Sequence, residues 1–227
     1  VLTSRGLGDV YKRQIQMDWC VGEVMKTLDR LKLAENTLVI FCSDNGPVMD
    51  DGYKDDALEK LGVHRAAGPY TGGKYSVYEG GTRTPFITRW TGRIQPAISS
   101  EMVCTIDMAA SFASLTGQTI PNDQCVDSQN ILGALLGEKG AKGRDHLVQQ
   151  DNGARGTFGM RVVSDKGDWK LHRHDKKSSR NTVVEKKLAN YKVPQFQLFD
   201  LSKDPAEKKN VMKENPEIGA ELKAKLQ

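Results

Sequence analysis

Apolar residues in the first part of the chain follow two different spacings. Over residues 15–33 they recur at helical intervals, which predicts an amphipathic helix. Over residues 37–41 (Thr-Leu-Val-Ile-Phe) they form an unbroken, largely β-branched run, which is typical of a strand buried on both faces. A helix followed by such a strand is one αβ unit of a layered sheet, so an α/β fold is predicted.

Three further elements are predicted before residue 120. Residues 84–90 should form the next strand, with Pro85 near its start, where proline is tolerated. Residues 55–61 have the spacing of a helical turn inside the long connection between the two strands. Residues 102–115 are predicted to form a helix whose buried stripe consists of Ile106, Ala109, Ala110, Ala113 and Leu115.

The pattern changes after residues 138–144, a charged, glycine-rich turn at which we expect a subdomain boundary. Short strand-like runs follow, and the turn Lys166-Gly167-Asp168 between two of them predicts a hairpin. The tail from Asp204 to Leu226 is predicted to be helical. The predicted strands cover residues 147–149, 157–163, 169–172 and 196–201.

Composition and charge narrow the class of protein without identifying it. The 227 residues are 38% hydrophobic and 27% charged, and no apolar run approaches the length of a membrane span. A formal charge of +4, without an aromatic and basic motif, does not indicate nucleic-acid binding. A soluble globular chain of one or two domains is expected.

The four cysteines give no framework for the fold. They allow three pairings, and none of them has the spacing of a CxxC metal motif. We expect them to be small buried apolar residues. They are Cys20, Cys42, Cys104 and Cys125.

The strand over residues 37–41 ends on Asp44 and Asn45, followed by glycine and proline. These residues place two oxygen ligands at the rim of the predicted sheet, where ligands and metals gather in open α/β folds. The alternative is an Asx-turn that merely closes the strand.

A second glycine-rich block, residues 72–87, favours the metal-ligand reading over the Asx-turn. It reads GGKYSVYEGGTRTPFI, and with the preceding Ser-Asp-Asn-Gly it resembles the formylglycine-dependent sulfatases, whose motifs follow in the same order. The resemblance runs from about residue 15 to the C-terminus. It implies part of an alkaline-phosphatase-like layered sheet with helices on its faces, followed by a small antiparallel sheet and a terminal helix.

The resemblance also implies a division of the chain. Residues 15–140 correspond to the C-terminal part of the sulfatase catalytic α/β domain, and residues 141–227 to a small α+β subdomain. Residues 1–14 bear no relation to the pattern, and we expect them to be a foreign or mis-joined stretch.

The site residues follow from the resemblance, position by position. Asp44 and Asn45 correspond to ligands of a calcium ion (Ca²⁺), a cation that takes about six to eight oxygens. Lys74 corresponds to the amine that contacts the sulfate and the leaving-group side. His64 and Arg65 lie in the long connection and are candidate substrate contacts; the alternative is that they are simply solvated.

The sulfatase nucleophile is a Cys or Ser followed by Pro or Ala at the second position and Arg at the fourth, and this chain has no such motif. Formylglycine is therefore expected in a missing N-terminal part, and the chain should not turn over substrate alone. Glu79 and Arg83 are predicted to pair and to hold the loop that carries Lys74.

The function expected from the resemblance is sulfuric ester hydrolysis on a sulfated small molecule or a sulfated glycan, with a periplasmic or secreted location. One alternative is a phosphonate or phosphodiester hydrolase of the same superfamily. Another is a non-catalytic module that binds sulfated glycans. Residues 170–192 carry eight Lys or Arg against two acids, which predicts a solvated insertion or a basic lip for polyanions.

Overall fold

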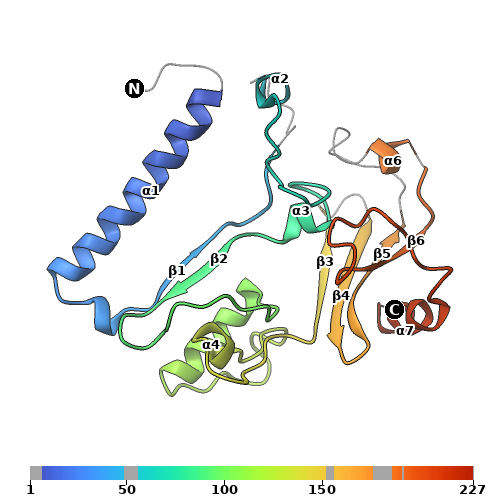
Figure 1. The fold of residues 1–227 in the computed structure, drawn as a ribbon. Coiled ribbons are helices and arrows are strands. Elements are labelled where there is room, and N and C mark those ends of the chain that lie inside the picture. Colours follow the sequence, from blue (N-terminus) through green and yellow to red (C-terminus); the bar gives the residue numbers. More distant parts are fainter. Residues whose placement is uncertain (1–6, 49–55, 152–155, 176–185, 191, 227) are drawn as a thin grey trace.

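A computed structural model describes residues 7–48, 56–151, 156–175, 186–190 and 192–226 (Figure 1). Two antiparallel sheets and several helices make up a mixed α/β fold, which confirms the predicted class. One sheet has two strands and the other has four. The predicted boundaries near residues 14 and 140 stay predictions.

The first helix is longer than its predicted span of 15–33. α1 covers Leu7–Arg30 and is followed by a short 3-10 helix, Ala34–Asn36. It begins inside the stretch expected to be foreign, because residues 7–14 contain no proline that would interrupt a helix. Several apolar side chains of α1 are exposed, Trp19 by 61%. Figure 1 shows α1 at the opposite end of the molecule from the four-stranded sheet.

β1 (Val39–Cys42) pairs antiparallel with β2 (Phe86–Arg89), with Ile40 opposite Thr88. The prediction that the first strand is buried on both faces is wrong, since β1 is only partly buried and Cys42 is exposed. A two-stranded ribbon gives each strand one neighbour, which leaves more of its surface open than an inner position in a wide sheet would.

α4 (Met108–Leu115) forms within the predicted helix 102–115, but its buried face differs from the predicted apolar stripe. Asp107 and Ser111 are fully buried, whereas Ile106 is 45% exposed. The Asp107 carboxylate accepts the backbone N–H of Gln129, and Ser111 Oγ accepts that of Ile131. These polar side chains are therefore buried because they satisfy the backbone of the following segment.

Residue Arg144 ties the same region to the second sheet. Its Nε lies 2.8 Å from Asp107 Oδ2, and both side chains are almost completely buried. The Asp107 carboxylate, as its hydrogen-bond acceptor, raises the pKa of Arg144, although burial opposes that effect. α5 (Leu132–Leu135) lies in the connection between α4 and this sheet, and Gly137, whose φ is +69°, follows its C-cap Leu136.

The four-stranded sheet confirms the strands predicted after residue 144. Its order is β3-β4-β5-β6, antiparallel throughout, and β4 and β5 form the predicted hairpin, with Ser164 opposite Gly167. The strands are β3 (His146–Gln150), β4 (Thr157–Ser164), β5 (Gly167–His174) and β6 (Phe196–Asp200).

The terminal helix is shorter than predicted. α7 covers Pro216–Leu226, whereas the residues from Asp204 onward form turns first. Pro216 occupies the first position of the helix, where a missing N–H costs nothing. The remaining short helices are α2 (Ala57–Leu61), within the predicted helical turn, α3 (Glu79–Thr82) and α6 (Lys186–Ala189).

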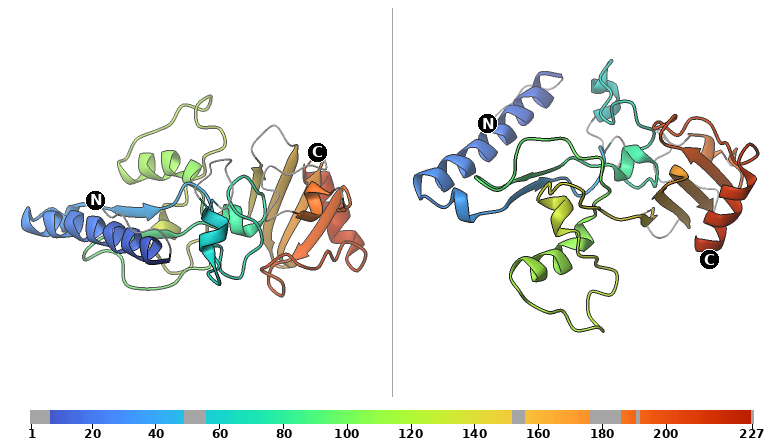
Figure 2. Two further views of the ribbon diagram at one scale, coloured as in Figure 1. Left: turned by 90° about the horizontal axis from the view of Figure 1, so that it is seen from above. Right: turned by 60° about the horizontal axis from the view of Figure 1, so that its bottom comes forward.

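The main hydrophobic core lies between the four-stranded sheet and α7. Figure 2 shows the sheet as a middle layer, with α7 on one side and α3 on the other. A second, smaller cluster on the α3 side joins Tyr78 to Phe199 and Leu201. The buried members of the main core are Met160, Val162, Trp169, Leu171, Leu198 and Leu222.

The cysteines are free thiols, and the prediction that all are buried is wrong. Cys20, Cys42 and Cys125 are exposed and Cys104 is half-buried, because they lie on an uncovered helix, a ribbon and connecting loops. Among the described residues, no helix has the length and apolar character needed to cross a lipid bilayer.

Candidate functional site

The turn after β1 presents the two predicted metal ligands. Ser43 Oγ donates to the carbonyl of Asn45 at 2.9 Å, which fixes the turn. Asn45 Nδ2 donates to the carbonyl of Gly46 at 2.9 Å, so the amide oxygen is the end of that side chain that could face a cation. Asp44 between them is exposed. The turn thus offers one carboxylate and one amide oxygen.

Backbone hydrogen bonds join this turn to the second glycine-rich block. The N–H of Gly46 donates to the carbonyl of Gly81 at 2.9 Å, and the N–H of Lys74 donates to the carbonyl of Pro47 at 2.9 Å. A Cβ on Gly46 would lie 1.9 Å from the carbonyl oxygen of Gly80, so only glycine fits there. Two motifs separated by about thirty residues are therefore one structural unit.

Lys74 lies beside the turn that carries Asp44. Asp44 is three residues from Pro47, so their Cα atoms are at most about 11 Å apart. The partly buried Lys74 has its Nζ 5.4 Å from the ring centre of Tyr75. Tyr75 itself has a φ of +76°, an uncommon conformation for a bulky residue.

The two glycines before Lys74, Gly72 and Gly73, are both buried. A Cβ on Gly72, whose φ is +88°, would lie 2.7 Å from Ser76 Oγ and 2.9 Å from the Cβ of Tyr78. The space is occupied by the chain itself, and the glycines allow a close backbone fold.

His64 and Arg65 lie apart from this unit. Both are exposed and follow α2, where the N–H of His64 donates to the carbonyl of Leu61 at 3.1 Å. Over the described ranges, no hydrogen bond or ion pair joins either side chain to Asp44 or Lys74. Their role as substrate contacts stays a prediction.

The predicted pair of Glu79 and Arg83 is confirmed. Arg83 Nη1 lies 3.2 Å from Glu79 Oε2, and Glu79 is buried at the start of α3. The same carboxylate oxygen is 3.6 Å from Arg161 Nη1 on β4. Glu79 therefore connects the Lys74 block to the four-stranded sheet.

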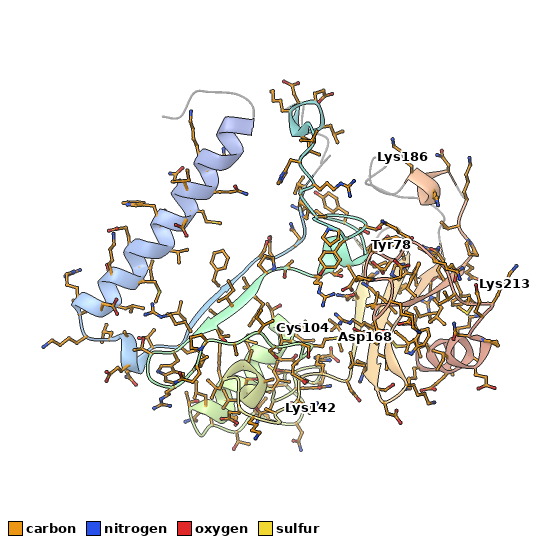
Figure 3. All side chains as sticks on the ribbon, in the orientation of Figure 1. Tyr78, Cys104, Lys142, Asp168, Lys186 and Lys213 are labelled. Carbon is orange, nitrogen blue, oxygen red and sulfur yellow. The ribbon has the colours of Figure 1, made fainter. Side chains whose placement is uncertain are left out.

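Sequence reasoning missed the main partners of Glu79. Lys170 on β5 has its Nζ 2.8 Å from Glu79 Oε1 and 3.7 Å from Glu207 Oε1. His172 Nε2 lies 2.9 Å from the same Glu207 oxygen, without the alignment of a linear hydrogen bond. The ring of His172 meets that of Tyr78 edge-on at 4.4 Å, and Figure 3 shows Tyr78 between α3 and the sheet.

These contacts correct the prediction that residues 170–192 form a solvated insertion or a basic lip, at least for the first residues of that stretch. Lys170, His172 and His174 are fully buried, neither solvated nor part of an exposed lip. Residues 176–185 of that stretch lie outside the described residues. The sequence signal that could have indicated this burial is the alternation of polar and apolar side chains in β5, which places the polar set on one face of the sheet and the apolar set on the other.

Burial and neighbouring charges shift the pKa values of His172 and Glu207. Burial, the largest effect, lowers the pKa of His172 against the attraction of the Glu207 carboxylate. For Glu207, burial acts to raise the pKa, but Lys170, His172 and the N–H of Glu79 together lower it. The structure therefore favours a neutral imidazole beside an ionised carboxylate.

The oxygen atoms of Asp44 and Asn45 fit part of a calcium site. Across the described ranges, no three His, Cys, Asp or Glu side chains gather closely enough to hold a metal ion. Asp44 and Asn45 are the hard oxygen donors that calcium prefers, but they are two of the six to eight it takes. The remaining ligands would have to come from outside these residues.

Comparison with known proteins gives consistent matches. Residues 10–118 match the sulfatase family. N-acetylgalactosamine-6-O-sulfatase of Bacteroides thetaiotaomicron is 43% identical over 98% of this chain and 42% of its own length. Human arylsulfatase A is 30% identical over 91% of this chain and 39% of its own length.

A solved sulfatase structure from work on the metabolism of multiple glycosaminoglycans by B. thetaiotaomicron shows the same fold. It has a TM-score of 0.79 and 44% identity, covering 93% of this chain and 42% of the other. The chain thus spans less than half the length of these relatives. Residues 10–118 belong to the sulfatase family, and the chain as a whole has the fold of a C-terminal sulfatase portion.

Proposed function

We propose that this chain supplies part of the active site of a calcium-dependent sulfuric ester hydrolase. Support comes from the joined turn and loop, in which the N–H of Lys74 donates to the carbonyl of Pro47 at 2.9 Å. This single contact keeps the backbone of Lys74 beside the turn that carries the predicted metal ligands Asp44 and Asn45. An ordinary Asx-turn would require no such neighbour.

Each side chain has a distinct part in this proposal. The Lys74 ammonium offers a point charge to a sulfate oxygen and to the departing oxygen, where negative charge grows as the S–O bond breaks. The Asp44 carboxylate and the Asn45 amide oxygen hold the cation. When bound, calcium supplies positive charge that offsets the negative charge on the sulfonyl oxygens. The formylglycine nucleophile is expected outside this chain.

The substrate class follows from the named relative. Since N-acetylgalactosamine-6-O-sulfatase shares 43% identity over nearly the whole chain, we propose a sulfated glycan, with a 6-O-sulfated amino sugar as the first compound to assay. A periplasmic or secreted location fits such a substrate and is part of the proposal. His64 and Arg65, exposed after α2, are the proposed contacts to the sugar.

The decisive variant is Asp44→Ala in a full-length sulfatase that contains this chain. Loss of a carboxylate ligand should lower turnover by roughly 100-fold or more and weaken calcium binding. Asp165→Ala, a change of the same kind in the exposed β4–β5 turn, should leave both unchanged. Unchanged turnover of Asp44→Ala at low calcium concentration would contradict the ligand assignment.

Two outcomes would favour the other functions. Faster hydrolysis of an aryl phosphonate ester than of an aryl sulfate would indicate the phosphonate or phosphodiester hydrolase. Calcium-independent retention on heparin, without any hydrolysis by the full-length protein, would indicate a glycan-binding module. The chain alone should bind calcium weakly because two oxygens make only part of a coordination shell.

A further inference from the structure

Residues Ala206 and Glu207 contact both ends of the loop that carries Lys74. At one end, Thr71 Oγ1 donates to the carbonyl of Ala206 at 2.5 Å. At the other end, the backbone N–H of Glu79 donates to Glu207 Oε2 at 2.5 Å. Lys74 lies between these two anchoring points, so the turn at 206–207 fixes where the loop begins and where it ends.

The two ends of the loop are also bonded to each other. The N–H of Gly80, the residue after Glu79, donates to the carbonyl of Thr71 at 2.7 Å. The loop is thus closed at its base, and the base is attached to the turn at 206–207. A displacement of that turn would move the whole loop rather than one of its ends.

Glu207 is held in place by the four-stranded sheet. Its Oε1 lies 2.9 Å from His172 Nε2 and 3.7 Å from Lys170 Nζ, and Lys170 also contacts Glu79 at 2.8 Å. All four side chains are almost completely excluded from solvent. Charged groups of this kind tolerate little displacement, because an unpaired buried charge is costly.

The backbone at Glu207 supports the same interpretation. Its φ is +54°, in the left-handed region that residues other than glycine, asparagine and aspartate seldom adopt. Tyr75, directly after Lys74, has a φ of +76°. Conformations of this kind persist where the surrounding contacts enforce them, and they gather at functional sites.

We infer that Glu207 and Lys170 are positioning residues for Lys74, because they fix the Glu79 end of its loop directly and hold the turn whose Ala206 carbonyl fixes the Thr71 end. This inference rests on the proposed role of Lys74 in contacting sulfate. It assigns the C-terminal sheet a part in the activity, although none of its residues is placed at the reacting atoms.

The first test measures hydrogen exchange in this chain, without any activity assay. Glu207→Gln and Lys170→Met should speed exchange over residues 71–83 while leaving α7 protected. Leu171→Ala is the matched control on the same strand, since its side chain packs against α7 on the opposite face; it should loosen α7 first. Glu214→Gln, at an exposed carboxylate, should change neither.

The second test measures steady-state kinetics of the full-length sulfatase well below its unfolding temperature. Glu207→Gln should lower kcat roughly 10- to 100-fold with little change in KM, because a misplaced Lys74 costs most in the transition state. Leu171→Ala should retain kcat at that temperature. Because Glu207→Gln keeps the side-chain shape, it carries the test if Lys170→Met does not fold.

The outcomes separate this inference from the proposed function. Unchanged exchange over residues 71–83 in Glu207→Gln would overturn the inference, as would equal losses of kcat in Glu207→Gln and Leu171→Ala. If Lys74→Ala abolishes turnover while Glu207→Gln retains it, the inference fails and the proposed function stands. If Lys74→Ala itself retains turnover, the proposed function fails.

Discussion

The two faces of the four-stranded sheet are packed by different kinds of interaction. On one face, Met160, Trp169 and Leu171 form an apolar core with α7. On the other, Lys170 and His172 belong to a buried group of charged and polar side chains that faces α3. Both faces come from the same strands, because successive side chains of a strand point to opposite sides.

The two faces differ in how strongly their interactions depend on direction, not in how deeply their side chains are buried. Apolar packing stabilises in proportion to the area removed from water and imposes weak directional preferences. Charged hydrogen bonds require defined distances and angles, and a broken one leaves a buried charge unpaired. The α7 face therefore stabilises the sheet without fixing one orientation, whereas the α3 face fixes the orientation of the loop against the sheet.

The largest effect is expected on the apolar face. Leu171 is fully buried, and Leu171→Ala should lower the free energy of unfolding by about 2–5 kcal/mol through lost burial and a residual cavity. Denaturant unfolding followed by circular dichroism measures this change. A loss below about 1 kcal/mol would contradict the assignment of the main core to this face.

An intermediate effect is expected where Val77, on the α3 side, packs against β4. A Cβ on Gly159 of β4 would lie 3.2 Å from the Cβ of Val77 and 3.5 Å from Lys170 Cε. Gly159→Ala should therefore cost about 1–3 kcal/mol by overpacking. Hydrogen exchange should increase over residues 71–83 and not in α7. The comparison of the two faces fails if α7 responds instead.

The smallest expected effect is the change in the free energy of unfolding with pH. The pKa of His172 is lowered below its ordinary value of 6.5, so the unfolded chain binds a proton there before the folded chain does. Stability should fall as pH drops from about 7.5 to about 5.5, with a slope of at most about 1.4 kcal/mol per pH unit for one proton.

A matching variant isolates that proton. His172→Gln should lose less stability than the parent chain between the two pH values. Denaturant midpoints at both pH values provide the measurement, and identical slopes for the variant and the parent chain would remove His172 from the acid response.

The elements of the C-terminal region were predictable because their pattern is local. Alternating side chains and the turn predicted at Lys166–Asp168 identify β4 and β5 without reference to the rest of the chain, although the structure places the turn itself at residues 165–166. The start of α7 was predicted too early, because a helical pattern of apolar residues does not distinguish turns from helix. The burial of Asp107 and Ser111 depended on distant backbone groups that no periodicity reveals.

The two motif blocks of the candidate site could be recognised in the sequence. The structural roles of their residues could be predicted only in part. The resemblance of the motif order singled out Asp44, Asn45 and Lys74 as candidates, and their roles stay predictions. The packing role of Gly72 and the pairing of Lys170 with Glu79 arise from segments that meet only in three dimensions. A lysine in a basic stretch is ordinarily expected to be solvated. Only the position of Lys170 on one face of a strand indicates that it is buried.

The hydrogen bond from Lys74 to Pro47 has a consequence for how the molecule can vary. The chain leaves the ribbon at Pro47 and comes back to the same point at Lys74. For a connection anchored at both ends, doubling its length adds only about 0.6 kcal/mol of closure entropy. An engineer could therefore graft a different segment between Pro47 and Thr71 and alter what surrounds the candidate site without displacing the loop that carries Lys74.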